Sequence, residues 1–590
     1  MKLTVAIAGV LLALAGTVPP QSPAIADLVL LNGAILTVDA RDSVHEALAI
    51  AGGKIAGVGT TAAMRRLAGD RTQIIDLAGR AVTPGLIDTH LHVTPPSDQL
   101  DLGDASIASI ADVLDRIRAE VATLKPGEWV RGRGWDEGKL AERRFLHASD
   151  LDQAAPANPV WLTHTTGHYG VANSLALKIA GITKTTPDPA AGTIDRDKNG
   201  DATGVMKESA TGLITRHVTG GGGRGTAAGS GAQGPPRVSD DPLAGLKRII
   251  EAFNREGLTT VKDPGVSGGR WNQYRQLLEA NALNVRVFAL WRGGRTLASV
   301  QQAIAQMANY PKLPASLGDG KLISGGMKLY IDGSGGARTG WMHQPWNLES
   351  AGTDGTNVGY PTTEPDVFKR QVRALHDAGV HIGTHAVGDK GMDWVVDAYA
   401  EALAATPTRG LRHSIIHANL PTDHAIDVMA RLQKQYDAGY PELQPPFLWW
   451  IGDTYAGNYG PSRSPRLLPL RTMQQKGVLW AGGSDYTVTP FAPRYGLWAS
   501  VVRKPLRGTY GATPFGTSES IDVRTALRSY TMWAAHQVFL ENRIGSLETG
   551  KDADLVVWDK NPYTVKPDDL QHLSAELTMV AGRIVYQKGR

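Results

Sequence analysis

Two histidines separated by one residue form the first chemical signal in this sequence. His90 and His92 end the apolar segment 86–92 (LIDTHLH), directly after the turn at residues 83–85 (TPG). Residues two apart on a strand project from the same face, so both imidazoles can converge on one point. A His-x-His pair elsewhere is more often satisfied by hydrogen bonds, but its position at the end of an apolar strand favours a bound metal ion.

Four further side chains that can ligate metals lie at the ends of later apolar segments: Lys328, His385, His417 and Asp485. If these segments are strands of a parallel barrel, their carboxyl ends meet at one mouth, where barrel enzymes build their active sites. A buried lysine needs a partner or a chemical modification, because an isolated ammonium in low dielectric is costly. Carbamylation by CO₂ would turn Lys328 into an anionic ligand able to bridge two cations.

The composition limits what can hold such ions. The chain has 590 residues and no cysteine, which excludes disulfides, thiolate metal sites and Cys nucleophiles. Lys and Arg number 61 against 57 Asp and Glu, so the chain has no strong polyelectrolyte character and we expect no nucleic-acid binding. Any metal must be held by His, carboxylate or modified Lys. Zn²⁺ is the first choice, and Mn²⁺ or Fe²⁺ also suit the oxygen ligands.

Apolar strands alternating with amphipathic helices predict the scaffold that positions these residues. This alternation is typical of a parallel sheet in the α/β class. Eight strand candidates predict a closed (β/α)₈ barrel, a TIM barrel, over residues 85–544. The candidates are residues 86–92, 259–263, 285–291, 326–332, 381–388, 414–418, 443–448 and 478–485.

Both chain ends differ from this pattern and consist of short alternating strands broken by glycine. Residues 27–84 and 545–590 are therefore predicted to form one small composite β-sandwich domain beside the barrel. Residues 95–240 follow the first barrel strand and are far too long for an ordinary loop. We expect them to form an insertion or lid subdomain over the barrel mouth, with a flexible Gly-rich part at 220–234.

The first 26 residues have the charged start, apolar middle and small-residue exit of a secretory signal peptide. The apolar run of residues 3–18 is too short to span a bilayer comfortably. We expect cleavage after Ala26 and export of a protein without stable membrane insertion, most simply to a bacterial periplasm. The alternative is an N-terminal anchor helix that is retained.

Several short motifs follow one another along the chain in an order that is typical of one protein family. They are residues 31–37 (LNGAILT), 84–92 (PGLIDTHLH), 132–136 (GRGWD), 167–168 (GH), 173–174 (NS), 328–333 (KLYIDG), 385–389 (HAVGD), 483–485 (GSD) and 545–555 (GSLETGKDADL). With these motifs the sequence resembles the amidohydrolase superfamily over nearly the whole predicted mature chain. Specifically, it is similar to the amidohydrolase-3 group, which includes N-substituted formamide deformylases and relatives of D-aminoacylases.

The resemblance implies a metal-dependent hydrolase with one or two ions. His90 and His92 would hold the first ion and His385 and His417 the second, with carbamylated Lys328 as the bridge. Asp485 would ligate the first ion and contact the attacking water. Lys207 and Glu208 in the insertion offer a rival bridge. Lys328 is preferred because it lies on a predicted barrel strand, whereas Lys207 is expected on a helix.

The function implied is hydrolysis of a linear carbon–nitrogen bond, as in an amide, N-acyl, N-formyl or carbamate substrate. A bound cation lowers the pKa of water towards neutrality and polarises the scissile carbonyl. Asp485 would accept the proton of the water and deliver it to the leaving nitrogen. One alternative is an esterase, lactonase or phosphotriesterase on the same site, and another is an exported binding protein without turnover.

Four residues outside the predicted metal ligands are candidates to contact the substrate. His168 is the candidate to contact the carbonyl or the oxyanion, the alternative being a hydrogen-bonded loop histidine. Trp135 and Asp136 in the insertion are expected to contact substrate. Arg338 can bind a substrate carboxylate or, equally, pair with a structural Asp.

Three aromatic residues at and after the predicted seventh strand, Phe447, Trp449 and Trp450, hint at a small-molecule substrate that is apolar or aromatic. His413 is expected to be structural, and His376 and His424 to lie on helices as packing or surface residues. A homo-oligomer is one expectation for the assembly.

Overall fold

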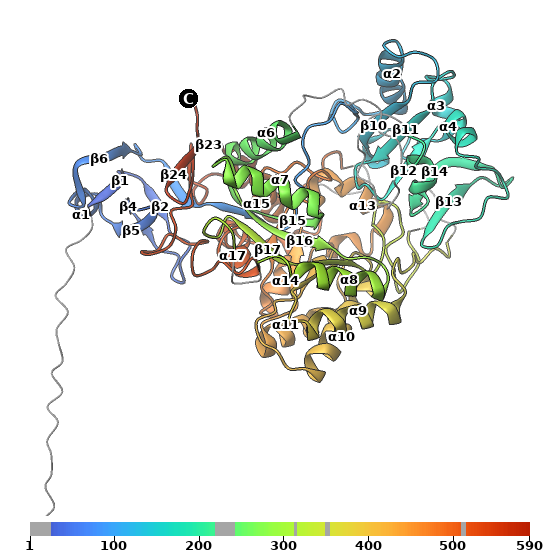
Figure 1. Cartoon of the computed structure of the whole chain (residues 1–590). Helices are drawn as coiled ribbons and strands as arrows, with labels where there is room; N and C mark the ends of the chain where they lie inside the picture. Colours follow the sequence, from blue (N-terminus) through green and yellow to red (C-terminus); the bar gives the residue numbers. More distant parts are fainter. Residues whose placement is uncertain (1–24, 219–241, 312–315, 348–354, 509–514, 590) are drawn as a thin grey trace, which may run out of the picture.

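The computed structural model describes residues 25–218, 242–311, 316–347, 355–508 and 515–589 (Figure 1). The predicted signal peptide thus lies outside the described residues except for Ile25 and Ala26. The Gly-rich segment 220–234 also lies outside them. Among the helices of the described part, none is long and apolar enough to cross a membrane.

An eight-stranded parallel sheet forms the centre of the molecule (Figure 1). Its first and last strands are joined near their ends by a hydrogen bond from Thr89 N to Gly482 O (3.1 Å), so the barrel is nearly closed. In spatial order the strands are β8 (Leu86–Asp88), β15 (Leu258–Val266), β16 (Arg286–Arg292), β17 (Leu322–Tyr330), β18 (Ile382–Ala386), β19 (Ser414–His417), β20 (Tyr440–Leu443) and β21 (Ala481–Gly482).

Helices alternate with these strands and pack outside the sheet (Figure 1). Local sequence explains where they begin. In α9, Pro365 occupies the first turn, and the side chain of the preceding Glu364 accepts from the N–H groups of Asp366 and Val367. The helices are α6 (Pro242–Arg255), α7 (Gly268–Glu279), α8 (Leu297–Met307), α9 (Pro365–Asp377), α10 (Asp389–Ala405), α11 (Asp423–Tyr436), α14 (Leu470–Gln475), α15 (Pro493–Val502), α16 (Val523–Ser529) and α17 (Met532–Gln537).

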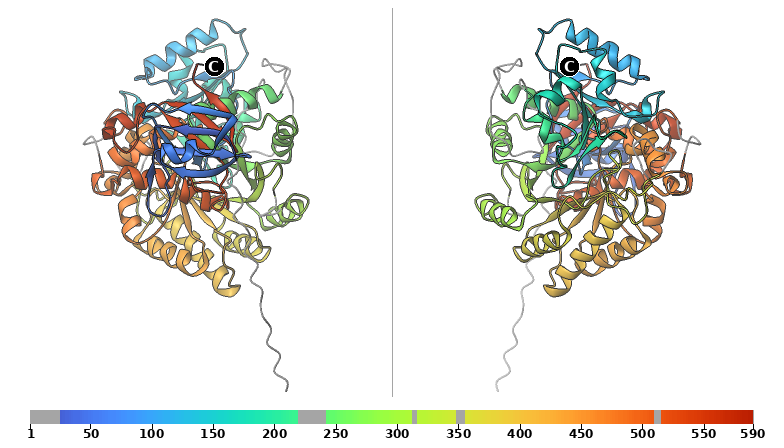
Figure 2. Two further views of the ribbon diagram at one scale, coloured as in Figure 1. Left: turned by 90° about the vertical axis from the view of Figure 1, so that its left-hand side faces the viewer. Right: turned by 90° about the vertical axis from the view of Figure 1, so that its right-hand side faces the viewer.

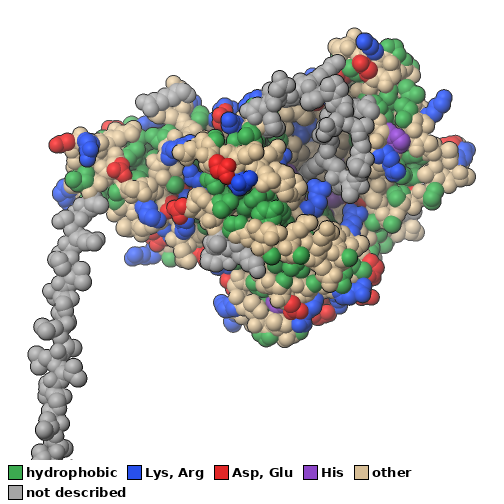
Figure 3. Space-filling view, in the orientation of Figure 1, with side chains coloured by type: hydrophobic (Ala, Val, Ile, Leu, Met, Phe, Trp, Pro, Cys, Tyr) green, Lys and Arg blue, Asp and Glu red, His purple; other side chains and the backbone are tan. Residues whose placement is uncertain are grey.

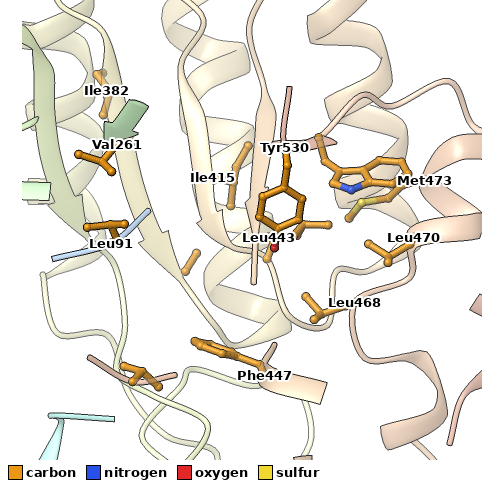
Figure 4. Close-up of a cluster of buried hydrophobic side chains, with 14 of the residues drawn as sticks. Leu91, Val261, Ile382, Ile415, Leu443, Phe447, Leu468, Leu470, Met473 and Tyr530 are labelled. Atoms are coloured by element: carbon orange, nitrogen blue, oxygen red, sulfur yellow. The ribbon is translucent and has the colours of Figure 1, made fainter. Parts of the chain in front are cut away.

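Buried apolar side chains fill the space around the barrel strands (Figure 4). Val261, Ile382 and Ile415 come from three different strands and are fully buried. Leu468, Leu470 and Met473 belong to the same cluster on the side of α14 (Figure 4). This close-packed shell holds the strand ends in fixed positions, which the polar groups at the barrel mouth require.

The predicted seventh strand, residues 443–448, is wrong in its bounds. The strand is β20 (Tyr440–Leu443), and Phe447–Trp450 form the short helix α12. Pro445 and Pro446 supply no backbone N–H, so a strand cannot continue through them. The predicted eighth strand, 478–485, is a strand only at Ala481–Gly482.

The insertion has its own sheet and core. Its six strands are, in spatial order, β13 (Gly192–Arg196), β14 (Ala202–Glu208), β12 (Tyr169–Ala172), β11 (Val160–His164), β10 (Val130–Trp135) and β9 (Leu100–Asp101). The helices α2 (Ile110–Val121), α3 (Ala148–Asp152), α4 (Ser174–Ile179) and α5 (Thr211–Thr215) accompany them. Lys207 lies on β14, so its predicted placement on a helix is wrong.

Strands from both ends of the chain pair with one another, as the interleaved blue and red ribbons in Figure 2 show. One sheet has the order β5 (Lys54–Gly59), β4 (Ala47–Ala51), β1 (Ala26–Leu31), β6 (Ala68–Asp76). The other has the order β24 (Arg583–Gln587), β23 (Ala575–Val580), β22 (Leu555–Trp558), β7 (Ala81–Pro84), β2 (Ala34–Leu36), β3 (Val44–His45). Leu48, Val82 and Leu577 belong to one apolar cluster that joins the two sheets.

Charged side chains of both signs are interspersed on the face of the molecule in Figure 3. This distribution agrees with the near balance of 61 basic and 57 acidic residues in the sequence.

Candidate metal centre

The ends of the first and last barrel strands are tied together by one carboxylate. Asp88 accepts hydrogen bonds from the N–H groups of His90 (2.9 Å) and Ser484 (3.0 Å). A Cβ at Gly483 would lie 2.8 Å from this carboxylate, so only glycine allows the close approach. Asp485 N in turn donates to His90 O at 2.6 Å. Residues almost four hundred positions apart are thereby fixed side by side.

His90, His92 and Asp485 form one group of potential metal ligands. The Nε2 atoms of His90 and His92 lie 3.6 and 3.4 Å from Asp485 Oδ1. One ligand atom from each residue lies within 4.8 Å of the others. Asp485 has a φ of 51°, an uncommon value for a residue other than glycine, and such strain persists where the surroundings impose it, often at functional sites.

Lys328 joins this group from β17. Its side chain is 1% exposed, and Nζ lies 3.4 Å from His90 Nε2. Its rival Lys207 is elsewhere: the Nζ of Lys207 pairs with Asp195 at 2.8 Å inside the insertion. The structure therefore brings Lys328, and not Lys207, beside the two histidines.

His385 and His417 complete the cluster at the ends of β18 and β19. Their ring centroids are 4.5 Å apart, and the His417 ring lies 5.1 Å from that of His90. His417 Nδ1 contacts Gln444 Oε1 (2.8 Å), and His385 Nε2 contacts the carbonyl of Gly333 (2.8 Å). Because these oxygens only accept, the contacting nitrogens carry the protons and the other ring nitrogens keep their lone pairs.

Burial keeps these imidazoles neutral. Desolvation lowers the pKa of His417 to about 3, and desolvation together with neighbouring positive groups lowers the pKa of His90 and of His385. A neutral imidazole is the form that binds a metal ion.

His168 reaches the barrel mouth from the insertion and is held there by a carboxylate. Its Nδ1 lies 3.0 Å from both carboxylate oxygens of Glu208, and its ring lies 5.1 Å from that of His385. Thr339 donates to Glu208 at 2.6 Å. Burial alone would raise the pKa of Glu208, but the charge and hydrogen bond of His168 bring it below its usual value. Glu208 thus contacts Nδ1 of His168 and fixes the orientation of the ring.

Three predicted substrate contacts lie in the interior instead. Trp135 is fully buried in the core of the insertion, and its Nε1 donates to Leu162 O at 3.2 Å. Asp136 accepts hydrogen bonds from Gly138 N and from the hydroxyl of Thr454 on α13 (Gly452–Tyr459). Arg338 is 1% exposed and donates to Asn458 Oδ1 at 2.9 Å. Burial leaves these three side chains no open face for a substrate.

A cavity of about 440 Å³ lies between the insertion and the barrel loops. Thr94, Tyr486 and Gly167 in its wall are close neighbours in sequence of His92, Asp485 and His168. Arg133 and Trp450 also line it. The cavity therefore begins beside the metal-ligand group and has polar and aromatic walls.

The aromatic residues after β20 have separate roles. Phe447 stacks beside His417, with ring centroids 6.0 Å apart. Trp449 stacks on Tyr495 (4.5 Å), and of the three only Trp450 lines the cavity.

The remaining histidines take the places expected for structural residues. His413 is fully buried and its Nε2 lies 3.0 Å from Nδ1 of the buried His376. His424 is exposed on α11 and pairs with Asp397.

A second group of potential metal ligands, Asp136, Glu137 and His164, lies where the insertion packs against α13. Here His164 Nδ1 accepts from Thr166 N–H at 3.1 Å, so Nε2 carries the proton and faces Glu137 Oε2 at 3.2 Å. Although burial lowers the pKa of His164, the carboxylates of Glu137 and Asp136 raise it above its usual value overall. A metal ion would have to displace this proton, so these residues suit one less well than the group at the barrel mouth.

A model of the amidohydrolase family matches residues 73–586. The chain belongs to the amidohydrolase family. It is 29% identical over 576 residues to N-substituted formamide deformylase of Arthrobacter pascens, covering 95% of this chain and 98% of that protein. It is 27% identical over 573 residues to the putative amidohydrolase YtcJ of Bacillus subtilis (strain 168), covering 94% and 99%.

The fold has a counterpart among solved structures. An uncharacterized metal-dependent hydrolase from Pyrococcus horikoshii OT3 superposes with a TM-score of 0.63 at 23% identity, over 92% of this chain and 99% of that chain. The predicted family is confirmed, and membership of the amidohydrolase family supports a hydrolase.

The donor set at the barrel mouth of this family member fits a divalent ion. Lone pairs on imidazoles and a buried carboxylate oxygen, Asp485 Oδ1, converge there. A polar group below them was not among the predicted residues: Lys262, His381 and Glu442, all buried in the barrel interior. A lysine in the middle of a predicted barrel strand, Lys262 after Val261, was the available signal.

Proposed function

We propose that this protein is a metal-dependent hydrolase that cleaves a linear carbon–nitrogen bond. The observation that carries the proposal is the convergence of four imidazoles, Lys328 and Asp485 beside the cavity. Family membership supports it, as does the similarity to a protein named N-substituted formamide deformylase.

His90, His92 and Asp485 would hold one divalent ion, most simply Zn²⁺, and His385 with His417 would hold a second. Such an ion lowers the pKa of water and polarises a carbonyl when it is bound. Lys328 would join the two positions after its neutral amine adds CO₂ and releases a proton, which leaves an anionic carbamate. Burial at 1% exposure favours this change, because it removes an ammonium from a low-dielectric site.

Asp485 is the proposed general base and acid. Its Oδ1 faces both His90 and His92, and its backbone is fixed by the hydrogen bond to His90 O. The carboxylate would take the proton of the attacking water and give it to the leaving nitrogen.

His168 is the proposed contact for the carbonyl or the oxyanion. Glu208 accepts from its Nδ1–H, which leaves Nε2 for the substrate. To donate to the oxyanion, Nε2 would also have to carry a proton, so the ring would act as an imidazolium paired with the Glu208 carboxylate. The side chain is 23% exposed, in contrast to the buried imidazoles of His90, His385 and His417, and it follows Gly167 in the cavity wall. Hydrogen bonds aimed at developing charge contribute strongly in such sites.

The substrate we propose is a small molecule with an apolar or aromatic group, which Trp450, Tyr486 and Phe491 in the cavity wall would contact. The test is a panel of matched amides and esters, assayed with and without a chelator. Chelator-sensitive amide hydrolysis supports the proposal. Turnover of esters alone would replace the amidase by an esterase, and bound metal without any turnover would favour a binding protein.

We also propose the cellular and domain context given by the sequence. Residues 1–26 would direct export to the periplasm and be removed. The sheets from the two chain ends would form a small β-sandwich domain. The protein would act without nucleic acid, as a monomer or homo-oligomer. Size-exclusion chromatography with light scattering and N-terminal sequencing of exported protein test these points.

A further inference from the structure

A chain of buried polar side chains crosses the barrel interior beneath His90. Lys262 on β15 and Glu442 on β20 are both 0% exposed and form an ion pair. Lys262 Nζ also lies 3.1 Å from Nε2 of His381, which is 3% exposed. Removing two charges from water costs several kcal/mol per ion unless their partners compensate, so packing alone does not account for this pair.

The hydrogen bonds assign the direction of each proton in the chain. His381 Nδ1 lies 3.0 Å from the carbonyl of Leu411, which only accepts, so this nitrogen carries the ring proton. His381 Nε2 therefore accepts from the ammonium of Lys262. A second N–H of Lys262 donates to Glu442 Oε1. The chain ends at Glu442 Oε2, an acceptor without a donor in the described part of the protein.

The imidazole of His90 faces that oxygen. Glu442 Oε2 and His90 Nδ1 are 3.9 Å apart, and neither atom has a hydrogen-bond partner among the described residues. The opposite ring nitrogen, Nε2, faces Asp485 Oδ1 and Lys328 Nζ. A separation of 3.9 Å exceeds a hydrogen bond, so the contact forms only when the ring or the carboxylate moves closer by about 1 Å.

We propose that Glu442 is a positioning residue for His90. It accepts the Nδ1 proton and so directs the Nε2 lone pair at the metal ion, while Lys262 and His381 hold the carboxylate in place. This inference rests on the proposed function, because it takes His90 as a ligand. Loss of a carboxylate behind a metal-binding histidine typically costs 10–100-fold in metal affinity.

The test is the Zn²⁺ affinity of Glu442→Gln, measured by competition with a chromogenic chelator. The amide oxygen can still accept from Lys262, and its NH₂ group then faces His90 and favours the tautomer with the proton on Nε2. We expect Zn²⁺ binding about 10–100-fold weaker than in the wild type. Affinity within twofold of the wild type would overturn the inference.

A matched control separates positioning from stability. Asp554→Asn breaks another buried ion pair, with Arg286 (2.8 Å), next to β22 and away from the metal-ligand group. It is expected to lower the melting temperature and leave Zn²⁺ affinity unchanged. An equal loss of affinity in both variants would show a general effect of stability and would also overturn the inference.

Two further variants keep the result interpretable. If Glu442→Gln fails to fold, the double variant Lys262→Met, Glu442→Leu removes both charges together, a change that buried pairs often tolerate. It also leaves His90 Nδ1 without its acceptor, so the same loss of affinity is expected, and unchanged affinity overturns the inference. His90→Ala that keeps full Zn²⁺ content would defeat the proposed function itself.

Discussion

Two buried clusters of histidine and carboxylate differ in the direction of the histidine pKa shift and in the contacts of the ring nitrogens. At the barrel mouth, burial lowers the pKa of His90 and His417, and their free nitrogens converge beside Asp485. In the insertion, carboxylates raise the pKa of His164, whose proton faces Glu137. Both groups combine histidine with carboxylate, and in both the ligand atoms lie within 4.8 Å of one another. In the insertion, the ring nitrogens of His164 already contact other groups of the protein, so the cluster is a structural contact. At the barrel mouth, ring nitrogens keep their lone pairs, so the cluster is a candidate metal site.

The largest expected effect is on metal content. His90→Ala should lose the ion and with it all turnover above background, because it removes a ligand from the central group. His164→Ala should keep wild-type metal content while its melting temperature falls. Metal analysis of both purified variants checks this, and metal loss in His164→Ala would remove the distinction between the clusters.

Next in size is the effect of Asp485→Asn. The amide retains the shape of the carboxylate but cannot take a proton from water, so kcat should fall by roughly 10²–10⁴-fold. Much of the metal should remain, since the imidazole ligands are intact. Near-normal rates in this variant would show that Asp485 does not transfer the proton.

A smaller effect is expected where the insertion meets the barrel. Thr454→Val removes the hydroxyl that donates to Asp136 and leaves the buried carboxylate with one donor fewer. The free energy of unfolding should decrease by about 1–3 kcal/mol. Chemical denaturation measures this, with metal content as the control. A variant as stable as the wild type would show that this contact does not hold the insertion.

The smallest expected effect is a pH dependence of the insertion cluster. Because the pKa of His164 is raised on folding, its contribution to stability is full below about 6.5, the usual value for histidine, and is lost as pH rises through the folded pKa. The advantage in melting temperature of the wild type over His164→Gln should therefore shrink between pH 6 and pH 8.5. An advantage that grows over this range would contradict the raised pKa.

The sequence predicted which side chains meet at the barrel mouth, and the structure places these side chains together. His90, Lys328, His385 and His417 were predicted because they end apolar segments, and parallel strands bring such ends together. The Pro445-Pro446 pair could have warned that the seventh strand ends early, since proline cannot donate to a sheet.

Contacts between elements were harder to predict from one sequence. Trp135 and Asp136 belong to a conspicuous motif, but whether a motif faces a cavity or a core depends on how the insertion packs on the barrel. Glu442 and Lys262 are 180 positions apart, and no local pattern indicates that they pair. Their relation to His90 became visible only with the fold.

The most direct test is a crystal structure of the Zn²⁺-loaded protein with anomalous diffraction measured at the zinc absorption edge. The account predicts an anomalous peak among His90, His92 and Asp485, next to Lys328. A peak at Asp136, Glu137 and His164, or loaded crystals with no peak beside His90, would contradict it.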